Sequence, residues 1–327
     1  MSDASTTARP ARHETGDDTV LPFGTVRSRI AGRIARLGPA IDAVLEAHDY
    51  PDPVREVLGE ALVLTALLGQ ALPQGGRLIL QTKSDGPLGF LVVQYETPGT
   101  LRGYASFDRE RIEALGAVSS GQLLGSGRMA MTIDPGGSQT SYQGIVLLDG
   151  GTLADAAHTY FRQSEQLPTF IRLAVARQYI GRTADGGPGG WHWRAGGLMV
   201  QHVPVAGGDP KPGETPEERD ARLHGEDDDG WQRVSILAAT VEPHELVDPT
   251  LSTERLLMRL FHEEGVRVGT ETAIVARCRC SRERIHAFLT RFSASELEGM
   301  REEDGGVTVK CEFCSKSYRF SPGDIAA

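Results

Sequence analysis

ARCRCSRER (residues 276–284) and VKCEFCSKSYRF (residues 309–320) are two stretches that together hold every cysteine of this 327-residue chain. The candidate ligands are Cys278, Cys280, Cys311 and Cys314. Thiolates supplied by two such pairs bind zinc tetrahedrally, with Zn–S distances of about 2.3 Å, and a site with four protein ligands leaves no position for a substrate. The sequence therefore predicts one zinc ion in a structural site rather than a hydrolytic one.

The first cysteine pair has an unusual spacing, because only one residue separates Cys278 from Cys280, whereas both pairs of an ordinary zinc ribbon are CxxC. Four arginines lie beside this pair, and a positive field favours the thiolate. They are Arg277, Arg279, Arg282 and Arg284. A disulfide closed across a single residue would be strained and readily reduced. We interpret the cysteines as a reversible switch; an ordinary structural zinc knuckle is the simpler alternative, and these residues leave it open.

Composition excludes several classes of protein. A small secreted disulfide scaffold is short and rich in cysteine, whereas this chain is long and poor in cysteine, so we expect reduced thiols in the cytoplasm. The net charge is −10, and residues 271–327 hold nine Lys plus Arg against nine Asp plus Glu. A nucleic-acid partner is therefore not expected, because phosphate binding requires a basic surface. We also expect no membrane partner, because no apolar run is long enough to cross a bilayer.

The pattern of the chain predicts an α+β fold in which an N-terminal core domain combines an antiparallel sheet with helices. Residues 1–19 are polar and are expected to form a disordered tail before a core domain at residues 20–205. Helices are expected in residues 38–72, interrupted at Pro51 and Pro53, and in residues 152–168. Strands are expected as three in residues 77–107, two in residues 127–151, and one each in residues 170–180 and 196–203.

A linker and a small C-terminal domain follow the core domain. Residues 206–270 are expected to form an acidic connector and then amphipathic helices, whose apolar stripe consists of Leu256, Leu257, Leu260 and Phe261. Residues 271–327 form the four-cysteine module, with one helix capped by Ser281, a second begun by the capping box of Ser293 and Glu296, and two strands. A module of this size has little core, so metal binding should supply much of its folding free energy.

The sequence resembles the redox-regulated chaperones of the heat shock protein 33 family, from about Val20 to the C-terminus. The resemblance rests on HDYPDPV (48–54), YQGIVLLDGGTL (142–153), YFRQSEQLPT (160–169), GGLMVQ (196–201), RLFHEEGV (259–266), CRCSRER (278–284), CEFC (311–314) and YRFSPGDI (318–325). The polar N-terminal tail and the insertions around residues 181–190 and 206–230 depart from the usual family pattern.

The resemblance implies a cytoplasmic holdase that needs no ATP and is inactive while its four cysteines hold zinc. Oxidants such as peroxide with heat, or hypochlorite, would join Cys278 to Cys280 and Cys311 to Cys314 and release the metal. The module and linker would then unfold, bind unfolding client proteins, and favour a homodimer. The apolar stripe of the linker needs a cover, and we expect the zinc-dependent module to provide part of it.

Two other functions compete with this interpretation. One is a zinc-ribbon nucleic-acid-binding protein, and the other is a thiol oxidoreductase, whose CxxC usually begins a helix in a βαβ unit. We predict no enzyme and assign no catalytic residue: Ser164 and Glu165 lack a partner base, and His262 lacks the second histidine of an HExxH motif. The single GxG at residues 125–127 is not a dinucleotide-binding motif, so zinc is the only predicted cofactor.

Overall fold

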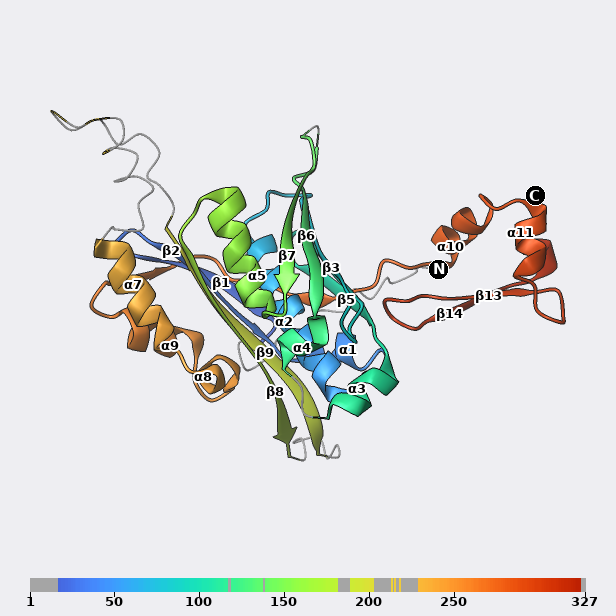
Figure 1. Ribbon diagram of the computed structural model, residues 1–327, viewed down its shortest axis with the longest axis horizontal. Coiled ribbons are helices and arrows are strands. Elements are labelled where there is room, and N and C mark those ends of the chain that lie inside the picture. The colour runs from blue at the N-terminus through green and yellow to red at the C-terminus, as the bar shows by residue number, and fades with distance from the viewer. Residues whose placement is uncertain are drawn as a thin grey trace, which may run out of the picture.

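The computed structural model describes residues 17–116, 119–137, 139–181, 189–202 and 229–324, with the single positions 213, 215 and 218. Two six-stranded sheets and the helices around them form the mixed α+β architecture that the sequence predicts (Figure 1). The acidic connector and most of the glycine-rich insertion fall outside the described residues. Of the helices in the described ranges, none is both long enough and apolar enough to span a bilayer.

Sheet A has the strand order β10-β1-β2-β9-β8, with β11 also paired to β1. All its strand pairs are antiparallel. Its strands are β1 (Thr19–Thr25), β2 (Ala31–Leu37), β8 (Thr169–Ile180), β9 (Gly190–Gln201), β10 (Val266–Val268) and β11 (Thr272–Ala273). The expected strands 170–180 and 196–203 are β8 and part of β9, whereas the sequence pattern did not predict β1, β2, β10 or β11.

Sheet B has the order β12-β5-β4-β3-β6-β7, and only the β12–β5 pair is parallel. Its strands are β3 (Arg77–Ser84), β4 (Phe90–Glu96), β5 (Thr100–Ser106), β6 (Ser126–Asp134), β7 (Tyr142–Asp149) and β12 (Val275–Ala276). This confirms the predicted three-stranded meander and the hairpin that follows it. The short helices α3 (Arg109–Leu115) and α4 (Ser120–Leu124) connect β5 to β6 and were not predicted.

Helix α2 (Asp52–Gly69) lies between the two sheets and contacts strands of both. It begins next to Pro51 and Pro53 as predicted, and α1 (Pro39–Leu45) precedes it. Its buried side chains point in all directions, which is the pattern of a helix enclosed on every side. Strand β9 passes so close to α2 that a Cβ atom at Gly197 would lie 2.5 Å from the side chain of Val63.

The helix predicted at residues 152–168 is α5 (Leu153–Tyr160), extended by the π-helical turn η1 (Phe161–Glu165). Thr152 and Asp155 form a capping box that begins α5. The segment ends at Gln166, which adopts the left-handed conformation with φ 54°. Helix α5 packs against β7 of sheet B and β8 of sheet A, so this segment bridges the two sheets.

The folded chain begins earlier than predicted. The expected disordered tail included Asp17, Asp18 and Thr19, but both aspartates are buried and Thr19 starts β1. Asp17 forms a buried ion pair with Arg194, and the carboxylate of Asp18 accepts hydrogen bonds from the backbone N–H groups of residues 38 and 40. These partners are distant in the sequence, which explains why the local polar composition gave the wrong boundary. Residues 1–16 lie outside the described part of the chain.

The linker helices pack on the outer face of sheet A. They are α7 (Asp229–Ala239), α8 (Pro243–Val247) and α9 (Thr253–Phe261). Leu256, Leu257, Leu260 and Phe261 are buried, as predicted, and they contact apolar side chains of β1, β2, β8 and β9. The expectation that the cysteine module covers this stripe was wrong: this cluster contains no described residue of the module, which lies on the other side of the molecule in Figure 1.

The C-terminal module contains α10 (Arg282–Leu289), α11 (Ala294–Gly299), the hairpin of β13 (Val307–Lys310) and β14 (Ser317–Phe320), and the 3-10 turn η2 (Pro322–Asp324). Ser281 caps α10, and Ser293 with Glu296 forms the predicted capping box of α11. Its buried apolar side chains are Leu289, Leu297, Val307, Tyr318 and Phe320. This core is small, as the sequence indicated.

Candidate metal centre

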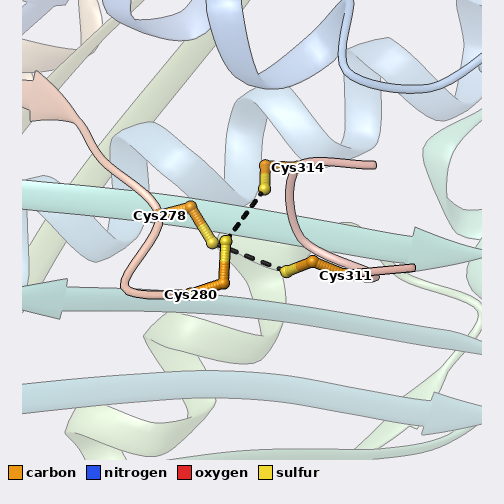
Figure 2. Close-up of side chains that lie close together, drawn as sticks. All are labelled: Cys278, Cys280, Cys311 and Cys314. Atoms are coloured by element: carbon orange, nitrogen blue, oxygen red, sulfur yellow. Dashed lines mark hydrogen bonds between the residues drawn. The ribbon is translucent and has the colours of Figure 1, made fainter. Parts of the chain in front are cut away.

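The four cysteines converge from two chain segments that the fold brings face to face (Figure 2). Cys278 and Cys280 lie in the loop between β12 and α10, and Cys311 and Cys314 lie in the turn that joins β13 to β14. The Sγ atoms of Cys278 and Cys311 are 3.6 Å apart, and those of Cys280 and Cys314 are 3.4 Å apart. All four Sγ atoms lie within 4.8 Å of one another.

Local hydrogen bonds set the positions of both cysteine pairs. In the second turn the backbone N–H of Cys311 donates to Lys316 O at 2.9 Å, and that of Ser315 donates to Cys311 O at 2.8 Å. Ser315 has a left-handed backbone with φ 56°, which turns the chain back into β14. Before the first pair, the backbone N–H of Arg277 donates to Leu101 O of β5. The first pair is therefore attached to the core domain and the second to the module's own hairpin.

This donor set fits a tetrahedral thiophilic metal ion. Four sulfurs placed 2.3 Å from one zinc ion would be about 3.8 Å from each other, close to the 3.4 Å and 3.6 Å seen here. Thiolate ligands favour zinc or an iron–sulfur cluster over magnesium or calcium. All four cysteines are free thiols of intermediate exposure, so the cluster is accessible from solvent.

The thiols of the cluster differ in acidity. Burial acts to raise the pKa of Cys278, but hydrogen bonds from the Cys280 backbone and from the other three thiols outweigh it and lower that pKa to about 7. Burial raises the pKa of Cys311, and it raises that of Cys314 to about 12. Cys278 is therefore more acidic than Cys311 and Cys314. The hydroxyl of Tyr318 donates a hydrogen bond to Cys280 Sγ at 3.2 Å, and this bond raises the pKa of Tyr318.

The predicted arginine field is partly neutralised by nearby carboxylates. Arg279 forms an ion pair with Glu96, at 2.9 Å, and Arg282 forms one with Asp324, also at 2.9 Å. Arg284 donates to the backbone carbonyl of Arg279. Hydrogen bonds within the cluster, rather than the arginines alone, thus account for the acidity of Cys278.

Side chains near the cysteines dock the module on sheet B. Phe313, between the second pair of cysteines, lies under the Arg102 guanidinium, with 4.1 Å from Arg102 Cζ to the ring centroid, and next to Tyr104. The hydroxyl of Ser315 contacts His48 at 3.0 Å. Sequence reasoning did not identify these contacts. His48 belongs to the motif HDYPDPV, but no spacing in the sequence connects it with the cysteines.

The residues that sequence reasoning set aside are not part of the cluster. Ser164 is exposed, and Glu165 accepts a hydrogen bond from the Tyr160 hydroxyl at 2.5 Å. His262 and Glu263 are exposed in the turn after α9. The second cysteine pair lies between two antiparallel strands, away from the helix start at which an oxidoreductase carries its CxxC.

Comparisons with known proteins find relatives along most of the chain. The family described as "Hsp33 protein" matches residues 18–321. The 33 kDa chaperonin of Caulobacter vibrioides (strain NA1000 / CB15N) is 46% identical over 310 residues, covering 94% of this chain and 95% of that protein. That of Nitrosococcus oceani is 38% identical over 311 residues, covering 94% and 93%. The crystal structure of the 33 kDa chaperonin (heat shock protein 33 homolog) from Thermotoga maritima has a similar fold, with a TM-score of 0.72 at 23% identity over 94% of this chain and 96% of that chain.

Proposed function

This chain belongs to the Hsp33 family, and from that membership we propose that it is a cytoplasmic chaperone that holds unfolding proteins without ATP and is activated by oxidation. The observation that carries the redox part of this proposal is the convergence of four free thiols from two segments onto one point. In the resting state Cys278, Cys280, Cys311 and Cys314 would hold one zinc ion, which supplies a cross-link between the two segments.

The small core of the module explains why the cysteines would control its folding. Five buried apolar side chains provide little burial, so the cross-link has to contribute much of the free energy of folding. Loss of the sulfur ligands would therefore unfold α10, α11 and the β13–β14 hairpin. It would also remove the contacts of Phe313 and Ser315 with sheet B.

The oxidation step is a two-electron reaction of each cysteine pair. The two thiolates of a pair give two electrons to one peroxide molecule, the O–O bond breaks, and two protons from solvent complete two water molecules while an S–S bond forms. We propose the pairs Cys278–Cys280 and Cys311–Cys314. The sulfur contacts at 3.6 Å and 3.4 Å run between the pairs, and each disulfide would bring two sulfurs of one pair to bonding distance as the cluster opens.

The segment that leads into the cluster connects it to the linker. Residues 266–276 pair with β1 through β10 and β11, and then with β5 through β12, directly before Cys278. Unfolding of the module would remove the anchor at the C-terminal end of this segment. Helix α9, at its other end, would then be held on sheet A by its own packing and by the short β10 and β11 pairings.

The surface that α7, α8 and α9 cover is suited to clients. It consists of buried apolar side chains on sheet A, including Phe23, Ile34, Leu198 and Val200. Release of the linker would expose these side chains together with those of α9, and large contiguous apolar patches mark interaction sites. Unfolding proteins would bind there, and the same patch would favour a homodimer of the oxidised protein. Nucleic acid is not among the proposed partners.

One experiment tests the proposal directly. Zinc content, free thiols and suppression of light scattering by an aggregating client are measured on reduced and peroxide-treated protein. We expect one zinc and no holding in the reduced protein, and two disulfides, no zinc and strong holding after oxidation. Serine variants at the four cysteines should bind no zinc and should not respond to peroxide. Zinc-free reduced protein, or holding that appears while thiols and zinc stay intact, would refute the proposal.

A further inference from the structure

A cavity of about 290 Å³ lies between the two sheets, at the C-terminal end of α2. None of the cysteines lines it. Strands of both sheets line it, and the segment from Tyr160 to Leu167, which includes the π-helical turn, forms one wall. Its volume is near the lower end of the roughly 300–1,000 Å³ of small-molecule sites. Single π-helical turns occur frequently at functional sites. Nothing in the proposed chaperone cycle uses this cavity.

The lining of the cavity is mostly apolar and adaptable. The aliphatic and thioether side chains that face it include Leu68, Leu72, Leu78, Met131, Ile133 and Met199. The methionines are flexible and polarisable, so this wall can adapt to the shape of a bound molecule. Such a lining favours a ligand with an apolar body.

One cation, Arg33 on β2, also lines the cavity. Its Nε donates to Gln70 Oε1 at 3.2 Å and its Nη1 to the Met199 thioether at 3.8 Å, which is a weak acceptor. No carboxylate of the described residues forms an ion pair with it. Burial lowers the pKa of Arg33, and no acidic side chain counteracts this effect. The guanidinium of Arg33 therefore lines the cavity as a cation without an ion pair among the described residues, and its remaining N–H groups are available to a ligand.

Two other arginines of the same sheet use their guanidinium groups within the fold. Arg194 forms a buried ion pair with Asp17, and Arg36 donates to three backbone carbonyls between residues 245 and 251. Arg33 contacts neither a carboxylate nor a backbone carbonyl among the described residues; its two hydrogen bonds go to the side chains of Gln70 and Met199. A guanidinium fork of this kind matches a carboxylate in a bidentate manner.

A second charged side chain in the lining limits the number of charges on the ligand. Glu165 lines the cavity, and its carboxylate accepts the hydrogen bond of Tyr160. A second anionic group on a ligand would approach this carboxylate and be repelled. The cavity therefore selects one negative charge and an apolar remainder.

We propose that this cavity binds a small monocarboxylate with an aliphatic body, with its carboxylate on Arg33 and its chain against the leucine and methionine wall. Because the site lies outside the redox cluster, the inference is independent of the proposed function. A bound molecule would touch both sheets at once and would stabilise the core domain by mass action.

Octanoate is the probe, and octanol is the uncharged control of the same chain length. The six methionines of the chain allow a local readout, because 13C-methyl spectra separate Met131 and Met199, in the cavity wall, from the exposed Met258 and Met300. We expect octanoate to shift the two cavity methyl signals saturably in the reduced full-length protein and to leave the two exposed ones unchanged. Octanol should bind at least tenfold more weakly.

Substitutions of Arg33 test whether this residue binds the carboxylate of octanoate. Arg33→Met should weaken octanoate binding at least tenfold and leave octanol binding unchanged, and Arg33→Lys should retain part of the affinity. Arg128→Met, on an exposed position of β6, is the matched control and should bind as the wild type does. If Arg33→Met fails to fold, the preference of the wild type for octanoate over octanol still tests whether the cavity recognises a carboxylate. Equal binding of the two probes, equal binding by Arg33→Met, or no shift of the cavity methyl groups would overturn the proposal.

Discussion

Arg279, the residue between the first two cysteines, forms a 2.9 Å ion pair with Glu96 at the end of β4. The pair joins the loop that carries Cys278 and Cys280 to sheet B, and both side chains are about one third exposed. Glu96→Gln should therefore weaken docking by about 0.5–1 kcal/mol. We expect peroxide to release zinc about two- to fivefold faster, measured with a chromogenic chelator. Glu113→Gln, exposed on α3, is the control, and equal rates in the two variants would show that docking does not protect the thiols.

Metal removal from the reduced protein should unfold the module selectively. Five buried apolar side chains cannot hold α10, α11 and the hairpin together, whereas the core domain has an extensive core of its own. A strong chelator should therefore make Arg282, Arg291 and Arg301 cleavable by trypsin while strands β1 to β9 stay resistant, as measured by mass spectrometry. The same chelator preloaded with zinc should have no effect. A module that stays resistant after complete zinc loss would contradict this expectation.

Loosening the linker should activate holding without an oxidant. Leu257 is buried against sheet A, and truncating a buried leucine to alanine costs about 3 kcal/mol. We expect Leu257→Ala to suppress client aggregation while reduced and loaded with zinc. Met258→Ala, at the exposed neighbouring position, should stay inactive until oxidised. A destabilised but inactive Leu257→Ala protein would show that sheet A is not the client surface.

The ion pair of Asp17 with Arg194 should contribute strongly to the stability of the core domain. Both side chains are buried, so Asp17→Asn leaves a guanidinium without its counter-ion and should lower the free energy of unfolding by roughly 3 kcal/mol in urea. Asp49→Asn is the matched control, because Asp49 pairs with Arg109 while its own side chain is 92% exposed. We expect less than about 1 kcal/mol for this control. Equal effects of the two substitutions would be inconsistent with a buried pair.

Glu60 should make stability depend on pH near neutrality. Burial, reinforced by Glu56, raises the pKa of Glu60 from 4.5 to about 7. The unfolded chain then ionises before the folded one, so this residue lowers stability progressively from about pH 4.5 to pH 7 and fully above pH 7. Glu60→Gln should match the wild type at pH 4.5 and exceed it by roughly 3 kcal/mol at pH 8. Urea unfolding at several pH values measures this difference, and a gain that is independent of pH would argue against a buried carboxylate.

The sequence predicted the elements that local signals specify. Helix α2 follows from Pro51, Pro53 and a long apolar run, and the caps of α10 and α11 follow from Ser281 and Ser293. Strands β1 and β2 carry no comparable local signal, and β10 and β11 are only two or three residues long. Their pairing with β1 joins opposite ends of the chain, so no local window of the sequence contains the information.

The same distinction applies to the candidate site. The spacing of the cysteines was sufficient to predict that four sulfurs would meet at one point. It could not identify Glu96, Arg102 or His48, because these residues reach the module only through the fold. The cover of the linker stripe was assigned wrongly for the same reason: Leu257 marks an apolar face, and only the tertiary structure shows that sheet A is its partner.

The eleven residues from Val266 to Ala276 form successive short pairings with sheet A and sheet B. Each pairing contains only two or three residue pairs, so each is weak, and they would open in order from the cysteine end. Detachment would then proceed in stages, from β12 to β11 to β10 and finally α9. We expect the exposed apolar area of sheet A to increase with the amount of oxidant. The capacity to bind clients would then increase gradually instead of appearing in a single step.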